Sequence, residues 1–146
     1  MAEGPRGEFL PLWSEYTDGQ FWNIYAQRVS PAGEPLDPAL LVGSSLLPPD
    51  QDLVAVAYGQ DMYLAAWEEV DPQVSLYPDY DIRGRFVDPG GAFLGEVTDL
   101  VMGPGNARMP ALTYNPDSGE FLLAFSADDG VGGPPQVYLQ RVGLEG

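Results

Sequence analysis

Three acidic segments hold most of the side chains that could do chemistry. They are residues 15–22, 68–81 and 127–135, and each of them separates two short apolar runs. Aromatic rings stack on the apolar faces of sugars, while carboxylates accept hydrogen bonds from sugar hydroxyls. The segments therefore suggest a glycan or small-ligand site, and its candidate residues are Tyr16, Trp22, Tyr77 and Tyr80. The alternatives are that Trp22 begins a strand and packs inward, and that the loops are solvated acidic surface.

Calcium is a second ligand that these segments could bind. Ca²⁺ takes six to eight oxygen ligands from carboxylates and backbone carbonyls. Asp71, Asp79 and Asp81 lie close together in the second segment and are the candidate ligands. No stretch matches an EF-hand loop, and residues 115–120 are typical of a hairpin turn. We expect no cofactor apart from this calcium option, and acidic loops that confer solubility are the alternative.

Paired carboxylates could also hydrolyse a glycosidic bond. Glu68 and Glu69 follow an apolar run directly, at the end of an expected strand. Adjacent residues of a strand point to opposite faces, so these two side chains cannot share one site. Only carboxylates from different repeats, such as Glu15 and Glu68, could form a pair. Catalysis is therefore the third reading, after a non-catalytic module and a glycan-binding one.

The composition removes many other kinds of chemistry. The 146 residues contain no His, no Cys and, by inspection, no Lys. This excludes a Ser-His-Asp triad, a thiolate zinc site, a P-loop lysine and a Schiff base. The 22 acidic residues against 6 arginines give a net charge of −16, which argues against nucleic acid and anionic membranes as partners. No apolar run is long enough to cross a membrane, and the first residues do not form a signal peptide.

The elements that would carry these segments are short strands. The 18 Gly and 15 Pro residues are spread evenly, so helices of ordinary length have almost no room. The runs between them are rich in Val, Tyr, Trp and Phe and end at Asp, Asn, Gly or Pro, as in an all-β protein.

These strands recur as a repeat with a period of about 56 residues. The matching segments are 54–59 and 110–115; 9–14, 63–68 and 121–126; 24–29, 82–87 and 137–142; 39–42 and 99–102. Four strands per unit fit the antiparallel blade of a β-propeller. We predict one domain over 1–146 with about 2.5 blades, in repeats of about 9–52, 53–109 and 110–142. A β-sandwich is the alternative.

The repeat resembles that of bacterial, mostly extracellular β-propellers. The general form of that repeat is PxVAYN, YLVVW, DIYGQRV and a DGxxLG turn, and here it is matched by 63–67, 81–87, 88–95 and 111–116. The resemblance implies a propeller fold and favours an extracellular or cell-surface location. It implies little about function, because the shared residues are those of packing and turns.

An arc of this length leaves two blade faces uncovered. We expect one bare face beside Leu10, Leu12 and Trp13 and another beside Leu123, Phe125 and Leu139. Monomers seldom expose apolar patches larger than a few hundred Å². The sequence therefore predicts a non-catalytic structural or binding module that completes a ring as a homo-oligomer, most simply a dimer, or that belongs to a longer propeller. A glycan or a protein is the expected ligand.

Overall fold

A computed structural model describes residues 1–17, 21–43, 51–71, 79–103, 105–128 and 133–143. These residues form strands, turns and extended backbone. The strands are β1 (Ala2–Glu3), β2 (Phe9–Leu10), β3 (Leu12–Thr17), β4 (Phe21–Ala26), β5 (Leu40–Gly43), β6 (Gln51–Gly59), β7 (Met62–Asp71), β8 (Asp79–Val87), β9 (Thr98–Val101), β10 (Ala107–Asn115), β11 (Glu120–Ala127) and β12 (Gln136–Val142).

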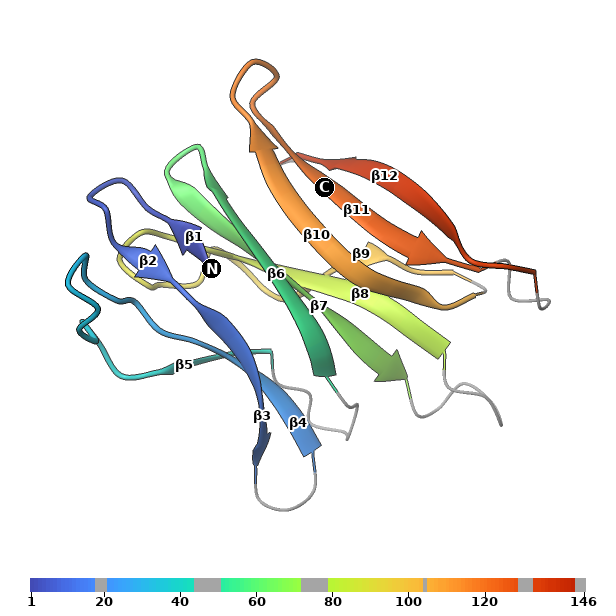
Figure 1. Ribbon diagram of the computed structural model, residues 1–146, viewed down its shortest axis with the longest axis horizontal. Helices are drawn as coiled ribbons and strands as arrows, with labels where there is room; N and C mark the ends of the chain where they lie inside the picture. The colour runs from blue at the N-terminus through green and yellow to red at the C-terminus, as the bar shows by residue number, and fades with distance from the viewer. Residues whose placement is uncertain (18–20, 44–50, 72–78, 104, 129–132, 144–146) are drawn as a thin grey trace.

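The larger strands form three antiparallel sheets that stand side by side in chain order (Figure 1). We call them blade 1 (β3-β4-β5), blade 2 (β6-β7-β8-β9) and blade 3 (β10-β11-β12). The short strands β1 and β2 pair with each other at the edge of blade 1. This architecture confirms the predicted fold class, because each blade consists of consecutive strands of an antiparallel meander.

Local sequence explains the two tight hairpins. Between β6 and β7, Gln60 and Asp61 have φ of 49° and 57°, the left-handed pair that a two-residue hairpin turn requires. Between β10 and β11, Gly119 has a φ of 68° and its N–H donates to the Asn115 carbonyl at 2.9 Å. The hairpin predicted at residues 115–120 is therefore present.

A bulge interrupts the first part of β6 and of β10. These are the first strands of blades 2 and 3, and we call them the inner strands. The register shifts between Asp52 and Ala55 in β6, and between Arg108 and Ala111 in β10. Leu53 and Met109 lie inside these bulges with φ of 43° and 58°. Bulges change the direction of the neighbouring side chains. Both inner strands therefore turn aside at the same end of the blades.

Two apolar clusters hold the blades together, one at each blade boundary. The cluster between blades 1 and 2 contains Leu10, Ile24, Tyr63 and Trp67. The cluster between blades 2 and 3 contains Leu64, Ile82, Leu123 and Phe125. Blade 2 is thus covered on both faces.

One detail of the expected bare faces was wrong. Leu10, Leu123 and Phe125 are buried, whereas Leu139 is exposed. The reason is the alternation of strand side chains, which sends neighbouring residues to opposite faces of a blade.

Arginines add polar ties between the blades. The Arg28 guanidinium forms an ion pair with Asp37 at 2.8 Å and donates to the Pro89 carbonyl of the neighbouring blade. Arg85 Nη1 reaches the Val42 carbonyl across the same boundary. Among the described residues, no helix has the length and apolar character to cross a membrane.

Candidate functional site

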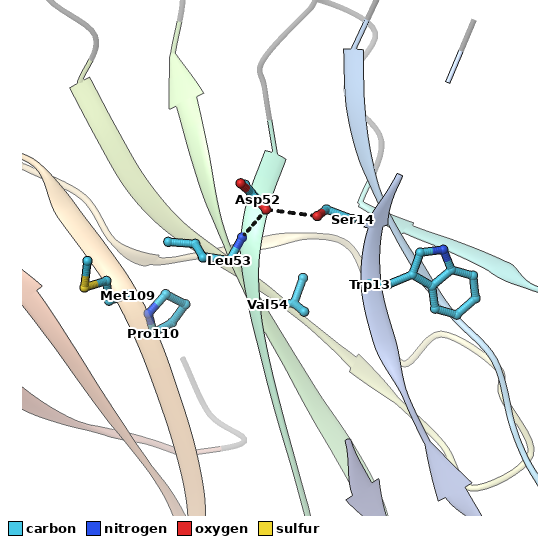
Figure 2. A pocket seen from close by; sticks show the side chains of 7 residues that line it. All are labelled: Trp13, Ser14, Asp52, Leu53, Val54, Met109 and Pro110. Atoms are coloured by element: carbon cyan, nitrogen blue, oxygen red, sulfur yellow. Dashed lines mark hydrogen bonds between the residues drawn. The ribbon is translucent and has the colours of Figure 1, made fainter. Parts of the chain in front are cut away.

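Three cavities meet at the end of the blades where the inner strands β6 and β10 begin. The smallest, of about 190 Å³, is lined by Trp22, Asp52, Glu68, Val70, Tyr80 and Arg108. A second, of about 570 Å³, lies on the far side of Arg108 and is lined by Tyr80, Asn106, Arg108, Met109, Ser126, Asp128 and Pro135. The third, of about 520 Å³, lies along the inner strands and is lined by Trp13, Ser14, Asp52, Leu53, Val54, Met109 and Pro110 (Figure 2).

Asp52 is a carboxylate that this end of the fold presents to solvent. Its Oδ1 accepts hydrogen bonds from the Ser14 hydroxyl at 2.9 Å and from the Leu53 N–H at 2.8 Å (Figure 2). Within the described part of the chain, no hydrogen bond to Oδ2 is seen. The side chain is exposed and borders two of the cavities. One oxygen is therefore fixed in position while the other can meet a ligand.

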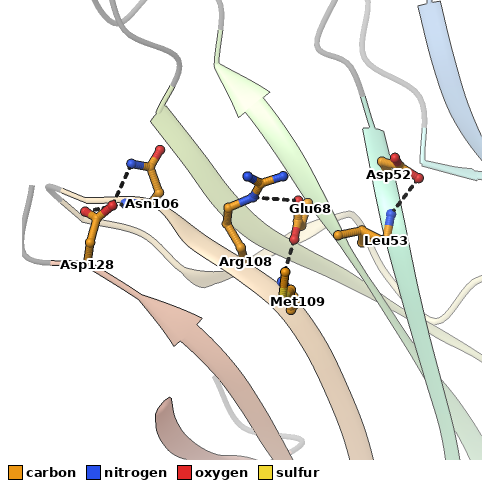
Figure 3. A network of polar contacts seen from close by, with 7 residues as sticks. All are labelled: Asp52, Leu53, Glu68, Asn106, Arg108, Met109 and Asp128. Carbon is orange, nitrogen blue, oxygen red and sulfur yellow. Dashed lines mark hydrogen bonds and ion pairs between the residues drawn. The ribbon is translucent and has the colours of Figure 1, made fainter. Parts of the chain in front are cut away.

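Glu68 lies directly opposite Asp52 in the β6–β7 pairing, yet its environment is different. The side chain is buried, with 2% of its surface exposed. Its Oε2 accepts from Arg108 Nε at 3.3 Å, and its Oε1 accepts from the Met109 N–H (Figure 3). Because both oxygens have partners on β10, Glu68 holds the bulge of the next blade in place.

Arg108 lines two of the cavities, those of about 190 and 570 Å³. Its guanidinium lies over the Tyr80 ring, 4.2 Å from the centroid, while Nε bonds to Glu68. A cation over an aromatic face is attracted by the ring quadrupole. The guanidinium is thus held between blades 2 and 3, and Arg108 lines both cavities.

Asn106 and Asp128 close the outer side of this end. The Asn106 amide donates to Asp128 Oδ2 at 2.9 Å, and its backbone N–H donates to Oδ1 at 3.1 Å (Figure 3). This pair joins the start of β10 to the end of β11, so the larger cavity has a fixed polar wall.

Glu69 points away from the cavities, as the alternation rule predicts. It accepts hydrogen bonds from Gln51 at 2.7 Å and Trp67 at 3.4 Å, and it forms an ion pair with Arg83 at 3.0 Å. Its carboxylate therefore belongs to the packing between blades 1 and 2, and only Glu68 of this pair borders the site.

The structure brings some of the predicted glycan-binding aromatics together. Tyr16 and Trp22 are exposed cross-strand partners with ring centroids 5.5 Å apart, so Trp22 does not pack inward. Tyr80 is half-buried beneath Arg108. Tyr77 lies outside the described residues. Trp22 and Tyr80 border one cavity, whereas Tyr16 is not part of its lining.

The predicted calcium ligands lie at the β7–β8 turn. Asp71 and Asp79 are backbone partners at the ends of these strands, and Asp81 follows two residues later on β8 opposite Glu69. No cluster of three or more possible metal ligands occurs among the side chains that the structure describes. Calcium binding here stays a prediction.

Sequence reasoning missed Asp52 and Arg108 as site residues. They occupy the same position of the repeat, 56 residues apart, at the bulge of each inner strand. The signal in the sequence is that an Asp and an Arg, of opposite charge, occupy the same position when the two inner strands are aligned residue by residue. The stronger local signal lies in the loops between the second and third strands of each repeat, where carboxylates and aromatic residues are concentrated.

No family model matches the sequence, and no curated protein sequence matches it. Several solved structures match the fold. The endo-arabinase of Bacteroides thetaiotaomicron VPI-5482 aligns with a TM-score of 0.62 at 14% identity, over 98% of this chain and 54% of that one. The Penicillium chrysogenum α-L-arabinanase complexed with arabinobiose gives 0.63 at 12% identity, over 90% and 41%. The Cellvibrio cellulosa α-L-arabinanase complexed with arabinohexaose gives 0.57 at 13% identity, over 96% and 52%.

These similarities establish the propeller-type fold, and the chain spans about half the length of the solved proteins. They also correct the expectation of a non-catalytic structural or binding module, since these neighbours are glycoside hydrolases. A carboxylate-dependent glycosidase, the third reading of the sequence, is compatible with these neighbours. The sequence does not distinguish a hydrolase from a non-catalytic module, because the repeat residues are those of packing and turns, which hydrolases and other propellers share.

Proposed function

We propose that this chain is part of a β-propeller glycosidase and supplies one carboxylate of its site, Asp52. The observation that carries the proposal is the contrast between two facing carboxylates. Asp52 is exposed with one oxygen available, whereas Glu68 is buried with both oxygens bonded. A carboxylate that contacts substrate needs an exposed side chain with an available oxygen, as in Asp52. A residue that positions others needs a buried side chain whose oxygens are bonded, as in Glu68.

The chemistry follows from general glycoside hydrolysis. One carboxyl group protonates the leaving oxygen, while the other activates water or attacks the anomeric carbon. Asp52 suits the second role, because its free oxygen can accept a proton from water or approach the sugar. Both oxygens of Glu68 are already hydrogen-bonded, so we do not assign Glu68 as the proton donor.

The substrate class that we infer is an arabinan-type chain of furanose sugars. Support comes from the solved neighbours, whose names specify arabinanase activity and, in two cases, bound arabino-oligosaccharides. The exposed indole of Trp22 offers a stacking surface, and the Arg108 guanidinium offers donors for adjacent hydroxyls.

An extracellular location is part of the same proposal, because polysaccharide hydrolysis takes place where the polymer is. We also infer that the repeat is the one found in bacterial, mostly extracellular propellers. The segments 63–67 and 81–87 support this by their likeness to that repeat.

The experiment is hydrolysis of linear arabinan and of an aryl α-L-arabinofuranoside by the full chain at several protein concentrations. Asp52→Asn removes the charge with little change in shape, and we expect it to lower the rate by about 100-fold or more. Asp117→Asn is the matched control, because Asp117 lies on the β10–β11 turn at the other end of the blade. Equal rates for the two variants, or no hydrolysis by the unmodified chain, would overturn the proposal.

Glu68→Gln separates positioning from chemistry. The amide keeps an acceptor for one of the two donors, so the fold should survive while the β10 bulge loosens. We expect a lower melting temperature and a raised KM, with a smaller loss of kcat than in Asp52→Asn. A loss of kcat as large as that of Asp52→Asn, at an unchanged melting temperature, would assign Glu68 a direct catalytic role instead.

A further inference from the structure

The two blade boundaries inside the chain are built from the same repeat positions. Blade 1 presents Leu10 and Ile24 to blade 2, and blade 2 presents the equivalent Leu64 and Ile82 to blade 3. All four side chains have 0% of their surface exposed. We call the side of each blade that carries these positions its forward face.

The forward face of blade 3 has no cover among the described residues. Leu122 and Val137 occupy the positions of Leu64 and Ile82, and Leu139 lies between them along the sheet. Val137 is 78% exposed and Leu139 is 67% exposed. Residues that are fully buried in two repeats are therefore in contact with water in the third, which marks this face as one half of an interface.

The opposite side of each blade, its receiving face, repeats in the same way. Blade 2 receives blade 1 with Trp67, and blade 3 receives blade 2 with the equivalent Phe125. In blade 1 this position is Trp13, which is only half-buried and points away from Asp52 in Figure 2. It stacks on Tyr25 with ring centroids 5.9 Å apart.

A polar detail supports the equivalence of Trp13 and Trp67. The Trp13 indole N–H donates to Glu15 at 3.0 Å, and the Trp67 indole N–H donates to Glu69 at 3.4 Å. The same side-chain bond, at the same two positions of the repeat, therefore orients the ring at the buried boundary and at the uncovered face. On the receiving face of blade 1, the Trp13 ring is therefore held by the same bond as the Trp67 ring at the covered boundary.

We propose that a second copy of this chain covers both faces, with the forward face of blade 3 packed on the receiving face of blade 1 of the partner. The forward face of the repeat packs only against a receiving face at both internal boundaries, and each copy has one uncovered face of each kind. Two copies joined head to tail satisfy all four faces around a two-fold axis, the commonest symmetry of oligomers. This interface does not depend on the proposed glycan chemistry.

The interface would lie close to the candidate site. Ser126 pairs in register with Val137 and lines the cavity of about 570 Å³. A partner on the forward face would therefore contact the strand position next to a residue of that cavity. The net charge of −16 opposes association, but charges are screened over about 8 Å at physiological salt.

The test is light scattering and sedimentation of the full chain over a 100-fold concentration range in ~0.15 M salt. We expect twice the chain mass of 15.8 kDa for the unmodified protein. Val137→Asp should give the monomer mass with an unchanged β-type circular dichroism spectrum. Leu94→Asp is the control, because Leu94 is 44% exposed on a turn away from either face, and this variant should remain a dimer.

Each contrary outcome overturns the proposal. A monomer at all concentrations means that another polypeptide segment or nothing covers these faces. A larger open assembly means that the contact does not close around a two-fold axis. A dimer that survives Val137→Asp, or that is lost equally in Leu94→Asp, means that the interface lies elsewhere or that the added charge acts nonspecifically.

Discussion

Replacing Trp67 with alanine tests the packing between blades 1 and 2 most directly. The ring has 0% of its surface exposed and lies in the cluster with Leu10, Ile24 and Val42. A Cβ on Gly43 would lie 3.0 Å from the indole, so the backbone of blade 1 already closes on the ring. Such a tightly enclosed site cannot collapse easily around alanine, and the loss should approach the upper part of the usual range for buried aromatics.

The magnitude follows from two contributions. Trp→Ala in a core costs about 3–5 kcal/mol. The lost bond to Glu69 adds little, because Gln51 and Arg83 still hold that carboxylate at 2.7 and 3.0 Å. At about 2–4 °C per kcal/mol for a chain of this size, a loss of about 4 kcal/mol lowers the melting temperature by about 8–16 °C.

The assay is thermal and urea unfolding at one fixed protein concentration, followed by circular dichroism. Trp22→Ala is the matched control, because the same substitution removes a ring that is 42% exposed and should cost less than about 1 kcal/mol. Trp67→Phe keeps most of the buried volume and should fall between the two. Equal midpoints for Trp67→Ala and Trp22→Ala would refute the assignment of Trp67 to a blade boundary.

Three further predictions address other parts of the chain. Gly59→Ala should lower the free energy of unfolding by about 1–3 kcal/mol in urea titrations, because a Cβ there would clash with the Tyr114 ring. Gly90→Ala, at an exposed glycine, is the control, and equal losses in the two variants would contradict the close approach of Gly59 to Tyr114. Burial raises the pKa of the Tyr63 hydroxyl above its ordinary value of 10.0, so the unfolded chain loses this proton first and the free energy of unfolding falls as pH rises above 10. Tyr63→Phe should therefore flatten the alkaline part of a plot of melting temperature against pH, and an unchanged slope would rule out this tyrosine as its source. The calcium hypothesis predicts that millimolar Ca²⁺ raises the melting temperature and that Asp81→Asn removes the rise, whereas no heat by calorimetry and no thermal shift would reject it.

The strand order of this fold could be predicted from sequence because each blade is local. Every blade strand pairs with the strand before or after it, so the period-2 alternation and the turn residues were sufficient. The Gly119 hairpin is an example, since its turn residues are contiguous. The uncovered side chains were predicted less well, because Leu10, Leu123 and Phe125 were expected beside bare faces and are buried.

The site was harder to predict because its contacts join distant residues. Glu68 and Arg108 are 40 residues apart, and they meet only because blades 2 and 3 pack together. The bulge at Leu53 adds a shift in register that no local pattern announces. Asp52 was overlooked for this reason, although its facing partner Glu68 had been singled out. The contrast between these two carboxylates could not be predicted, because solvent access and hydrogen-bond saturation depend on tertiary structure.

The separation of the sheets bears on how such a chain can change over evolutionary time. Among the described residues, no backbone hydrogen bond runs from one blade to the next, and the contacts across each boundary are made by side chains. Gene duplication or deletion of a whole unit between equivalent turns would therefore break no hydrogen-bonded ladder. It would only exchange one pair of repeat-equivalent surfaces for another, so the number of blades in this lineage can drift by whole repeats while each sheet stays intact.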